Sequence, residues 1–580
     1  MTHTFAIDTE TYYDKDCSIS SGLDVYVNHP KFDCYMLTVV GTDGTNYAGR
    51  PEDFDWSKLE GQVWLSHNRS FDKGIIDYLM RSGKVPWTFS KEWHCTSDLV
   101  AFLGYPRSLK GASKEVLGIE VSKDTRDAMK GKRWETMDED FRKEVLSYAT
   151  KDSELCLDLW QKLEHKWPEN ERRASRDTTD MCHYGLYVDQ DTLDRNIETL
   201  GSLLFEIEDT IPWAEEASRL STIELGKFCR KNDVDPPPST DKKDAGYIAW
   251  KARNPEMAKV TEAMGDYRSA NALLKKLKEM RSRVRPDDGR MGYGLKYCGA
   301  HTGRDSGDSG WNVQNMTKGE MFGVNLRNLV TAAPGHKLVI ADLSQIEPRC
   351  LAWLSGDTRM LEVARVVDDW YEVQARAWKL WTEEGSLKKN GPEVRDLVKA
   401  LNIGLGYGMS AGKFAMMTNL PLQRCETLTN MYRAANPKVT DLWRRLHAGM
   451  LNSARTGDTF VLQLPSGREL TYHRCSSANG LSAVITKGGQ RVRLKFWHGV
   501  LVENLVQAVA RDVFFDRVNA ISDAGYRVVL RVHDEVVCEV PEEEADDAAA
   551  DIKRLMTTPP SWMATLPLGA SCDIATKYTK

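Results

Sequence analysis

A short apolar run that ends in an acidic residue constrains this chain more than any other feature. The sequence Leu338-Val-Ile-Ala leads directly into Asp342, a pattern that predicts a buried strand with a carboxylate at its end. Gln345 and Glu347 follow at once, so polar groups gather at the same point. Taken alone, the segment is a strand followed by an acidic turn. A second carboxylate placed beside Asp342 would make it a site.

A candidate for that second carboxylate lies near the C-terminus. Residues 526–540 read as two β runs that meet at His533-Asp534-Glu535, which predicts a hairpin with an acidic turn. If this turn lies beside Asp342, two carboxylates meet at one point. Paired carboxylates are the arrangement that phosphoryl transfer with two metal ions requires.

The N-terminal third contains a separate set of acidic residues. Asp8 and Glu10 are two residues apart in a predicted strand, so their side chains share one face. Asp72 lies in the early turns of an amphipathic helical pattern, and Tyr148 and Asp152 are four apart on a predicted helix. Four carboxylates brought together need cations between them to stay ionised. The alternative is that they are unrelated surface acids.

Length and composition limit the class of protein. A chain of 580 residues is too long for one hydrophobic core, so two or more domains are expected. The net charge of −6 argues against a uniformly basic DNA-coating protein but allows a basic groove beside acidic sites. The twelve cysteines never occur as Cys-x-x-Cys, so we expect reduced thiols and no zinc site. No secretory signal or bilayer-spanning apolar run is visible, so we expect a cytoplasmic protein with no membrane partner.

Two helical patterns carry clustered basic residues. Within residues 267–285 an apolar stripe of leucine and methionine is surrounded by Lys275, Lys276 and Lys278, which indicates either a solvated face or contact with phosphates. In residues 395–408 four side chains recur every fourth position and share one helical face. The same segment contains three glycines between positions 404 and 408. Each glycine lowers helix stability by about 1 kcal/mol relative to alanine, so an ordinary amphipathic helix explains residues 395–408 poorly.

Three of these segments together resemble family A DNA polymerases. Residues 342–349 (DLSQIEPR) are similar to motif A of that family, residues 395–408 (RDLVKALNIGLGYG) to motif B, and residues 532–535 (VHDE) to motif C. They occur in the family order, and the resemblance extends over nearly the whole chain. The N-terminal acidic set with Tyr148 resembles the proofreading exonuclease domain of the DnaQ-like family.

The resemblance implies a multidomain fold of the α/β and α+β classes. An RNase H-like 3′–5′ exonuclease domain is expected at residues 1–167, and a right-hand polymerase domain at 168–580. Within the latter, the resemblance places the thumb at about 190–287, the palm at about 288–356 and 500–580, and the fingers at about 357–499.

The resemblance also implies roles for individual residues. Each active site is expected to hold two Mg²⁺ ions, with Mn²⁺ as a substitute: one pair on Asp342 and Asp534, the other on the four N-terminal carboxylates, with Tyr148 orienting the attacking water. Lys399 is expected to protonate the leaving pyrophosphate, and Glu347 to block a ribose 2′-hydroxyl. The residues expected to bind the nucleotide are Arg395, Lys399, Ile403, Tyr407, Gln345 and Glu347. The residues expected to contact DNA are Arg304, Gln314, Asn315, Gln507, His533, Lys275, Lys276 and Lys278.

The leading hypothesis is a template-directed DNA polymerase with a proofreading exonuclease in the same chain. Its expected partners are primer–template DNA and deoxynucleoside triphosphates, and it is expected to be a monomer; any helicase or processivity factor is left open. The compact length is similar to that of phage members, which suggests DNA replication in a bacterial or phage-infected cytoplasm. Two alternatives are a single-subunit RNA polymerase, against which the exonuclease set and Glu347 argue, and a DNA-binding scaffold with decayed sites, against which the intact Asp342, Asp534 and Lys399 argue.

Overall fold

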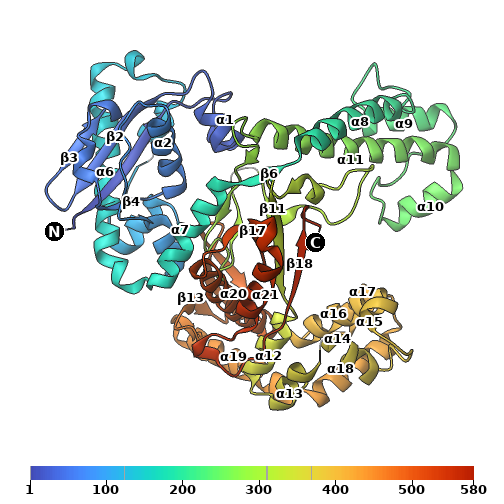
Figure 1. The fold of residues 1–580 in the computed structure, drawn as a ribbon. Helices are drawn as coiled ribbons and strands as arrows, with labels where there is room; N and C mark the ends of the chain where they lie inside the picture. The colour runs from blue at the N-terminus through green and yellow to red at the C-terminus, as the bar shows by residue number, and fades with distance from the viewer. Residues whose placement is uncertain (1, 123, 309–310, 368, 580) are drawn as a thin grey trace. The chain divides into compact units, whose positions relative to one another are not determined.

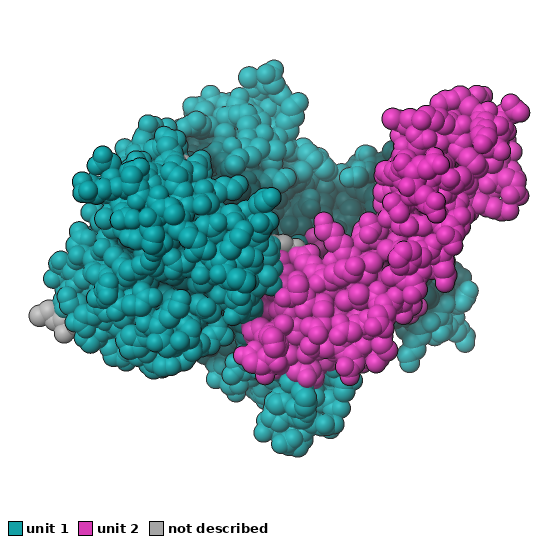
Figure 2. All heavy atoms as spheres, turned by 90° about the horizontal axis from the view of Figure 1, so that it is seen from above, with its two compact units in different colours: residues 1–185, 293–314, 333–576 teal, residues 186–292, 315–332, 577–580 magenta. Residues whose placement is uncertain are grey.

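The structure is a computed structural model that describes residues 2–122, 124–308, 311–367 and 369–579. The chain divides into two compact units, which are coloured separately in Figure 2. Unit 1 comprises Met1–Gly185, Tyr293–Gln314 and Ala333–Thr576, and unit 2 comprises Leu186–Gly292, Asn315–Ala332 and Lys577–Lys580. The predicted exonuclease, thumb, palm and fingers ranges are finer than this division and stay predictions. In the described ranges no helix is both long and apolar enough to cross a membrane.

The first part of unit 1 is built on a five-stranded sheet of order β3-β2-β1-β4-β5 (Figure 1). Its strands are β1 (Thr4–Thr11), β2 (Cys34–Gly41), β3 (Asn46–Gly49), β4 (Val63–Ser66) and β5 (Glu92–Cys95). The central strand β1 pairs antiparallel with β2 and parallel with β4. Because β1 is covered on both faces, Phe5, Ala6 and Ile7 are all buried.

Seven α-helices accompany this sheet in the described part of residues 1–185. They are α1 (Leu23–Val27), α2 (Arg69–Arg81), α3 (Thr96–Phe102), α4 (Leu109–Ala112), α5 (Asp124–Met129), α6 (Glu139–Leu163) and α7 (Glu169–Tyr184). Helix α6 packs on β1 and β2, where the hydroxyls of Thr38 and Ser153 lie 2.7 Å apart. Helix α6 ends at Leu163, and a 3₁₀ turn follows at Glu164–Lys166. Pro168 is the N-cap of α7, where its missing N–H is not needed and its carbonyl accepts from the backbone N–H of Arg172 at 3.0 Å.

The second sheet of unit 1 has four strands in the order β16-β17-β11-β18. They are β11 (His336–Leu343), β16 (Arg527–Val532), β17 (Glu535–Pro541) and β18 (Ala570–Ala575), and all neighbours are antiparallel. The predicted strand into Asp342 and the predicted hairpin around His533 are both present. Helices α12 (Ile346–Ser355), α20 (His498–Asp523) and α21 (Ala545–Thr557) pack with this part of the chain, and a short ribbon, β8 (Leu295–Lys296) with β9 (Ser306–Gly307), precedes it.

Between α12 and α20 the chain forms helices and then a separate antiparallel sheet. The helices are α13 (Thr358–Val366), α14 (Trp370–Ala377), α15 (Leu387–Asn390), α16 (Pro392–Gly406), α17 (Ala411–Thr418), α18 (Leu422–Ala435) and α19 (Pro437–Thr456). The strands are β12 (Phe460–Gln463), β13 (Glu469–Ser476), β14 (Ser482–Lys487) and β15 (Gln490–Lys495), paired in sequence order.

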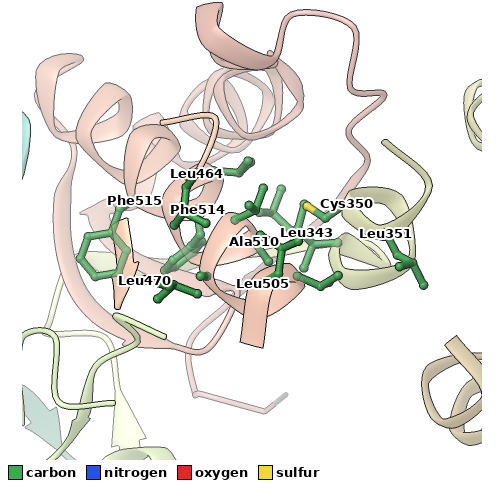
Figure 3. Close-up of a cluster of buried hydrophobic side chains, with 14 of the residues drawn as sticks. Leu343, Cys350, Leu351, Leu464, Leu470, Leu505, Ala510, Phe514 and Phe515 are labelled. Carbon is green, nitrogen blue, oxygen red and sulfur yellow. The ribbon is translucent and has the colours of Figure 1, made fainter. Parts of the chain in front are cut away.

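The largest hydrophobic core of unit 1 surrounds α20. Figure 3 shows Leu505, Ala510 and Phe514 of this helix in one cluster with Leu343 of β11 and Leu351 of α12. Since α20 is buried along most of its length, it is a rigid support for the sheet that carries Asp342.

Unit 2 is mainly helical. It contains α8 (Gln190–Glu208), α9 (Thr222–Lys231), α10 (Ala245–Arg253) and α11 (Pro255–Arg283), with a small sheet of β6 (Leu186–Val188), β7 (Arg290–Met291) and β10 (Val330–Thr331). The apolar stripe expected in α11 is buried: Leu273, Leu274, Leu277 and Met280 all face the core. Around it Lys275, Lys276 and Lys278 are exposed.

Candidate active sites

The first candidate site lies where β11 meets the β16–β17 turn. Asp342 on β11 pairs in register with Glu535 on β17, and the backbone N–H of Leu343 donates to the carbonyl of Asp534 at 3.1 Å. Because Val532 pairs with Glu535, the turn consists of His533 and Asp534 alone. His533 adopts a positive φ of 57°, as tight hairpin turns require. The hairpin therefore delivers Asp534 to the end of β11.

The electrostatics of this pair fit a divalent cation. The pKa of the Asp534 carboxyl is raised to about 7, chiefly by burial and then by the nearby charges of Asp342 and Glu347, while Arg304 opposes the shift. Two carboxylates that disfavour each other's ionised form are stabilised by a cation between them. The donor set, oxygen only, suits Mg²⁺ or Mn²⁺.

Glu347 connects the acidic strand to the end of α16. Its two carboxylate oxygens accept from Arg304 Nη2 at 2.8 Å and from the Tyr407 hydroxyl at 2.7 Å. Burial and the Glu347 charge raise the pKa of Tyr407 well above its ordinary value, so the phenol stays protonated as the donor. Three of the residues singled out in the sequence are thus held together by two charge-assisted hydrogen bonds.

A second bridge joins Gln345 to the start of α16. Gln345 Nε2 donates to Asp369 Oδ1 at 3.2 Å, and Arg395 Nε donates to Asp369 Oδ2 at 2.6 Å. The Arg395 guanidinium also lies 5.3 Å from the centre of the Tyr371 ring. Arg395 is therefore oriented by Asp369, whose side chain also caps the N-terminus of α14.

The remaining predicted nucleotide and DNA contacts lie on separate elements. On α16, Lys399 is exposed and Ile403 is half-buried against the core. On α20, Gln507 Nε2 donates to Glu503 Oε1 at 3.3 Å, and at the hairpin turn His533 is exposed. Gln314 and Asn315 fall in a 3₁₀ turn, the first in unit 1 and the second in unit 2.

The second candidate site lies on the N-terminal sheet. Asp8 and Glu10 stand on β1, Asp72 in the first turn of α2, and Tyr148 and Asp152 on α6, the helix that packs on β1. Thr9 fixes Asp72, because its backbone N–H and its hydroxyl both donate to Asp72 Oδ1, at 3.1 and 2.8 Å. The structure brings all five sequence-predicted residues together around one cleft of about 790 Å³.

The carboxylates of this cleft raise one another's pKa values. The pKa of Glu10 is raised to about 8, chiefly by burial and then by the charges of Asp152 and Asp72, while Arg126 opposes the shift. Burial raises the pKa of Asp8 well above its usual range, with Asp72, Glu10 and Asp152 contributing. Within the described ranges no three acidic, histidine or cysteine side chains form a closed metal-binding shell. The mutual pKa shifts nevertheless show that the carboxylates repel one another, a repulsion that divalent cations would relieve.

Several residues of these sites carry no sequence signal. Arg126 on α5 lines the cleft and is the cation that lowers the pKa values of Asp8 and Glu10. Arg468 Nη2 donates to the carbonyl of Thr302, and Arg511 Nε to that of Gly303, both at 2.9 Å. These two buried arginines hold the loop that precedes Arg304. Their partners are backbone carbonyls far away in the chain, which a sequence pattern does not reveal.

The end of the β11 sheet and the end of α16 are joined through Glu347, which binds both Arg304 and Tyr407. The chain belongs to DNA polymerase family A, whose family model matches residues 224–580. It is 32% identical over 283 residues to the DNA polymerase of Bacillus phage SP02, in an alignment that covers 44% of this chain and 43% of that one. It is 31% identical over 279 residues to DNA polymerase I of Pseudomonas aeruginosa, covering 47% of this chain and 28% of the other. The matches span less than half the length of these two relatives.

A solved structure is similar over the whole chain. It is the POL domain of Pol1 from M. smegmatis, in complex with DNA primer-template and dNTP. The two structures share a TM-score of 0.69 at 18% sequence identity, covering 100% of this chain and 96% of the other. At this identity the likeness shows the fold alone. The predicted family is confirmed, together with its mixed α/β polymerase fold.

Removing one carboxylate of the N-terminal cleft is expected to stabilise the metal-free protein at alkaline pH. The pKa of Glu10 is about 8 in the folded protein and near 4.5 ordinarily. The folded state keeps a proton that the unfolded state releases, so the free energy of unfolding falls as pH rises across that interval. In chelator, Glu10→Gln should therefore raise the thermal unfolding midpoint at about pH 8.5 and barely change it at about pH 4. Mg²⁺ should stabilise the native protein more than the variant. If Glu10→Gln raised the unfolding midpoint equally at both pH values, repulsion between the carboxylates would not be the cause.

Proposed function

We propose that this chain is a template-directed DNA polymerase that extends a primer 3′ end and carries a 3′–5′ exonuclease for proofreading. The observation that carries the proposal is the placement of Asp534 beside Asp342, at the end of a sheet connected to α16 by Glu347. Family membership supports the polymerase reaction. Replication, of a phage or of a bacterial genome, is the use that we propose for it.

The polymerase site would work through its own residues as follows. Asp342 and Asp534 would hold two Mg²⁺ ions, or Mn²⁺, which activate the primer hydroxyl and neutralise triphosphate charge. Lys399, exposed on α16, would bind the triphosphate and protonate the departing pyrophosphate, and Arg395, fixed by Asp369, would add a second positive charge. Gln345 orients Asp369 and thereby Arg395.

The sugar and the base pair would meet a second group of residues. Tyr407 and Glu347, hydrogen-bonded to each other, would cover the sugar, with Ile403 as an apolar contact beside them. Arg304, Gln507 and His533 would contact the primer–template near the new base pair, together with Gln314 and Asn315. The exposed lysines 275, 276 and 278 of α11 would contact duplex phosphates without regard to sequence.

The N-terminal cleft would hydrolyse mispaired primer ends. Asp8, Glu10, Asp72 and Asp152 would hold two divalent cations that supply an activated water for attack on the terminal phosphodiester. The Tyr148 hydroxyl would orient that water, because burial, and then the Asp152 charge, raise its pKa and keep it protonated. Thr9 would hold Asp72 in place through its two hydrogen bonds.

The test of this proposal is extension of a labelled primer on a template with deoxynucleotides and Mg²⁺. Extension complementary to the template, together with 3′–5′ shortening when nucleotides are omitted, would support it. Synthesis from ribonucleotides without a primer would support the RNA polymerase alternative. Binding of primer–template without either reaction, in folded protein, would support a scaffold.

Sugar discrimination gives a sharper prediction. Glu347 is fixed by Arg304 and Tyr407. If it lies beside the sugar as proposed, a ribose 2′-hydroxyl would clash with it or remain unpaired. Glu347→Ala should raise the ratio of ribonucleotide to deoxynucleotide incorporation by about ten- to a hundredfold, the scale of about 1.4–2.8 kcal/mol of lost discrimination. The measurement is single-nucleotide insertion kinetics with each sugar. Tyr407→Phe, which removes one hydrogen bond to Glu347 but keeps the carboxylate, should change the ratio less. An unchanged incorporation ratio in Glu347→Ala would show that a residue other than Glu347 discriminates between the sugars.

A further inference from the structure

The exonuclease cleft of unit 1 is lined in part by a hairpin that comes more than three hundred residues later in the chain. Strands β14 and β15 are joined by a two-residue turn in which Lys487 pairs with Gln490. The turn residues Gly488 and Gly489 have φ values of 58° and 77°, the left-handed pair that a tight hairpin turn needs. Gly488, Gly489 and Gln490 line the same cleft as Asp8 and Glu10.

The hairpin is fastened to the N-terminal region by a defined set of contacts. Arg491 forms a two-point ion pair with Glu115, at 3.0 Å from Nε to Oε1 and 2.6 Å from Nη2 to Oε2. Arg491 Nη1 and the Thr486 hydroxyl both donate to the carbonyl of Gly104, at 2.9 and 2.7 Å. These anchors flank the turn on both strands, so the tip is held in position over the cleft instead of moving as a free loop.

The chemistry of the cleft indicates what the tip would touch. The carboxylates at its base repel a DNA backbone, whereas Lys110 and Arg126 add positive charge to its walls; Arg107, also in the lining, is paired with Asp98. Gly489 lies against Arg107: a Cβ built on this glycine would be 3.6 Å from Arg107 Cβ. An amide side chain and a glycine turn can donate hydrogen bonds to phosphate and sugar oxygens, and the glycines let a nucleic acid backbone approach closely. Gln490 is exposed and available for such a contact.

We propose that the tip of the β14–β15 hairpin binds the single-stranded 3′ end of DNA and guides it to the N-terminal carboxylates. This proposal rests on the exonuclease activity proposed above, and it adds a substrate-positioning residue, Gln490, and an anchoring ion pair, Arg491–Glu115. The tip acts on the strand a few nucleotides from the cleaved bond, so it affects long substrates and not short ones.

The experiment compares two substrates in the full chain. One is a single-stranded oligonucleotide; the other is the p-nitrophenyl ester of thymidine 5′-monophosphate, which is small enough to reach the carboxylates without touching the hairpin. Lys487 is exposed and pairs with Gln490 across the turn, so it would add a positive charge for phosphate at the tip. Gln490→Ala combined with Lys487→Ala should raise the KM for the oligonucleotide by about three- to tenfold, the loss expected for two exposed polar contacts. The kcat on the oligonucleotide and both constants for the ester should stay within about twofold of native. The matched control is Lys495→Ala, which removes a lysine at the other end of β15, away from the turn.

A charge exchange tests the anchor separately from folding. Arg491→Glu should raise the oligonucleotide KM, because it replaces the ion pair with a repulsion, and adding Glu115→Arg should restore it toward the native value. An oligonucleotide KM that stays native in both the tip variant and Arg491→Glu would overturn the hairpin proposal while leaving the exonuclease in place. If the native protein hydrolyses neither substrate, the exonuclease proposal itself fails, and the guiding role falls with it.

Discussion

Replacing Asp342 with asparagine is expected to reduce primer extension by about a thousandfold or more. The change keeps the size of the side chain but removes a charge that the metal-dependent step requires, a loss worth about 4 kcal/mol of transition-state stabilisation. Asp534→Asn should have an effect of similar size, because its carboxyl lies beside Asp342 and senses that charge. The measurement is single-turnover extension of a labelled primer by one deoxynucleotide.

The matched control for both variants is Asp573→Asn. Asp573 is an exposed carboxylate on β18, opposite Ile340 of β11 and two residue pairs from the pair of Asp342 with Ser571, so it tests removal of a nearby charge from the same sheet. It should leave extension nearly unchanged, and all three variants should still degrade single-stranded DNA. Substantial extension by Asp342→Asn in folded protein would show that this carboxylate does not hold the catalytic cations.

The elements that carry Asp342 and Asp534 could be predicted because their signals are local. Four apolar residues before an acid predict a buried strand, and two β runs around a short polar turn predict a hairpin. The antiparallel pairing of β11 with β17 then follows once the hairpin lies beside the strand. The four-residue recurrence of Arg395, Lys399 and Ile403 likewise predicts the face of α16 that the structure contains.

The connections between elements could not be predicted, since they depend on contacts between residues far apart in the chain. Nothing near Asp369 in the sequence indicates that it binds both Gln345 and Arg395. The same holds for Arg511, whose guanidinium donates to Gly303 and to both oxygens of Glu171. Periodicity reports which face of an element is buried, but not which partner covers it. The hairpin at Gly488-Gly489 is a further case: the two glycines indicate a turn, but nothing in the sequence indicates that this turn lines the N-terminal cleft.

The combined change Asp8→Ala and Glu10→Ala is expected to lower 3′–5′ degradation of single-stranded DNA by about a thousandfold or more, again the scale of 4 kcal/mol. Both side chains extend from β1 into the cleft, and the pKa of each is raised by the other carboxylates, so they belong to one electrostatic set. Extension of a matched primer should remain within about twofold of native, because the polymerase carboxylates stand on a different sheet.

The control for this change is Glu52→Ala with Asp53→Ala, two exposed acids in the 3₁₀ turn that follows β3. It removes the same number of negative charges from the same region, so a decrease in hydrolysis there would indicate a general charge effect. A mispaired primer gives the decisive comparison: the Asp8 and Glu10 variant should extend from the mismatch or stall, whereas the native protein should remove the mismatched nucleotide first. If the variant still removes it in folded protein, the hydrolytic site is not the cleft on β1. If the variant loses extension as well, the two acidic sites do not work independently.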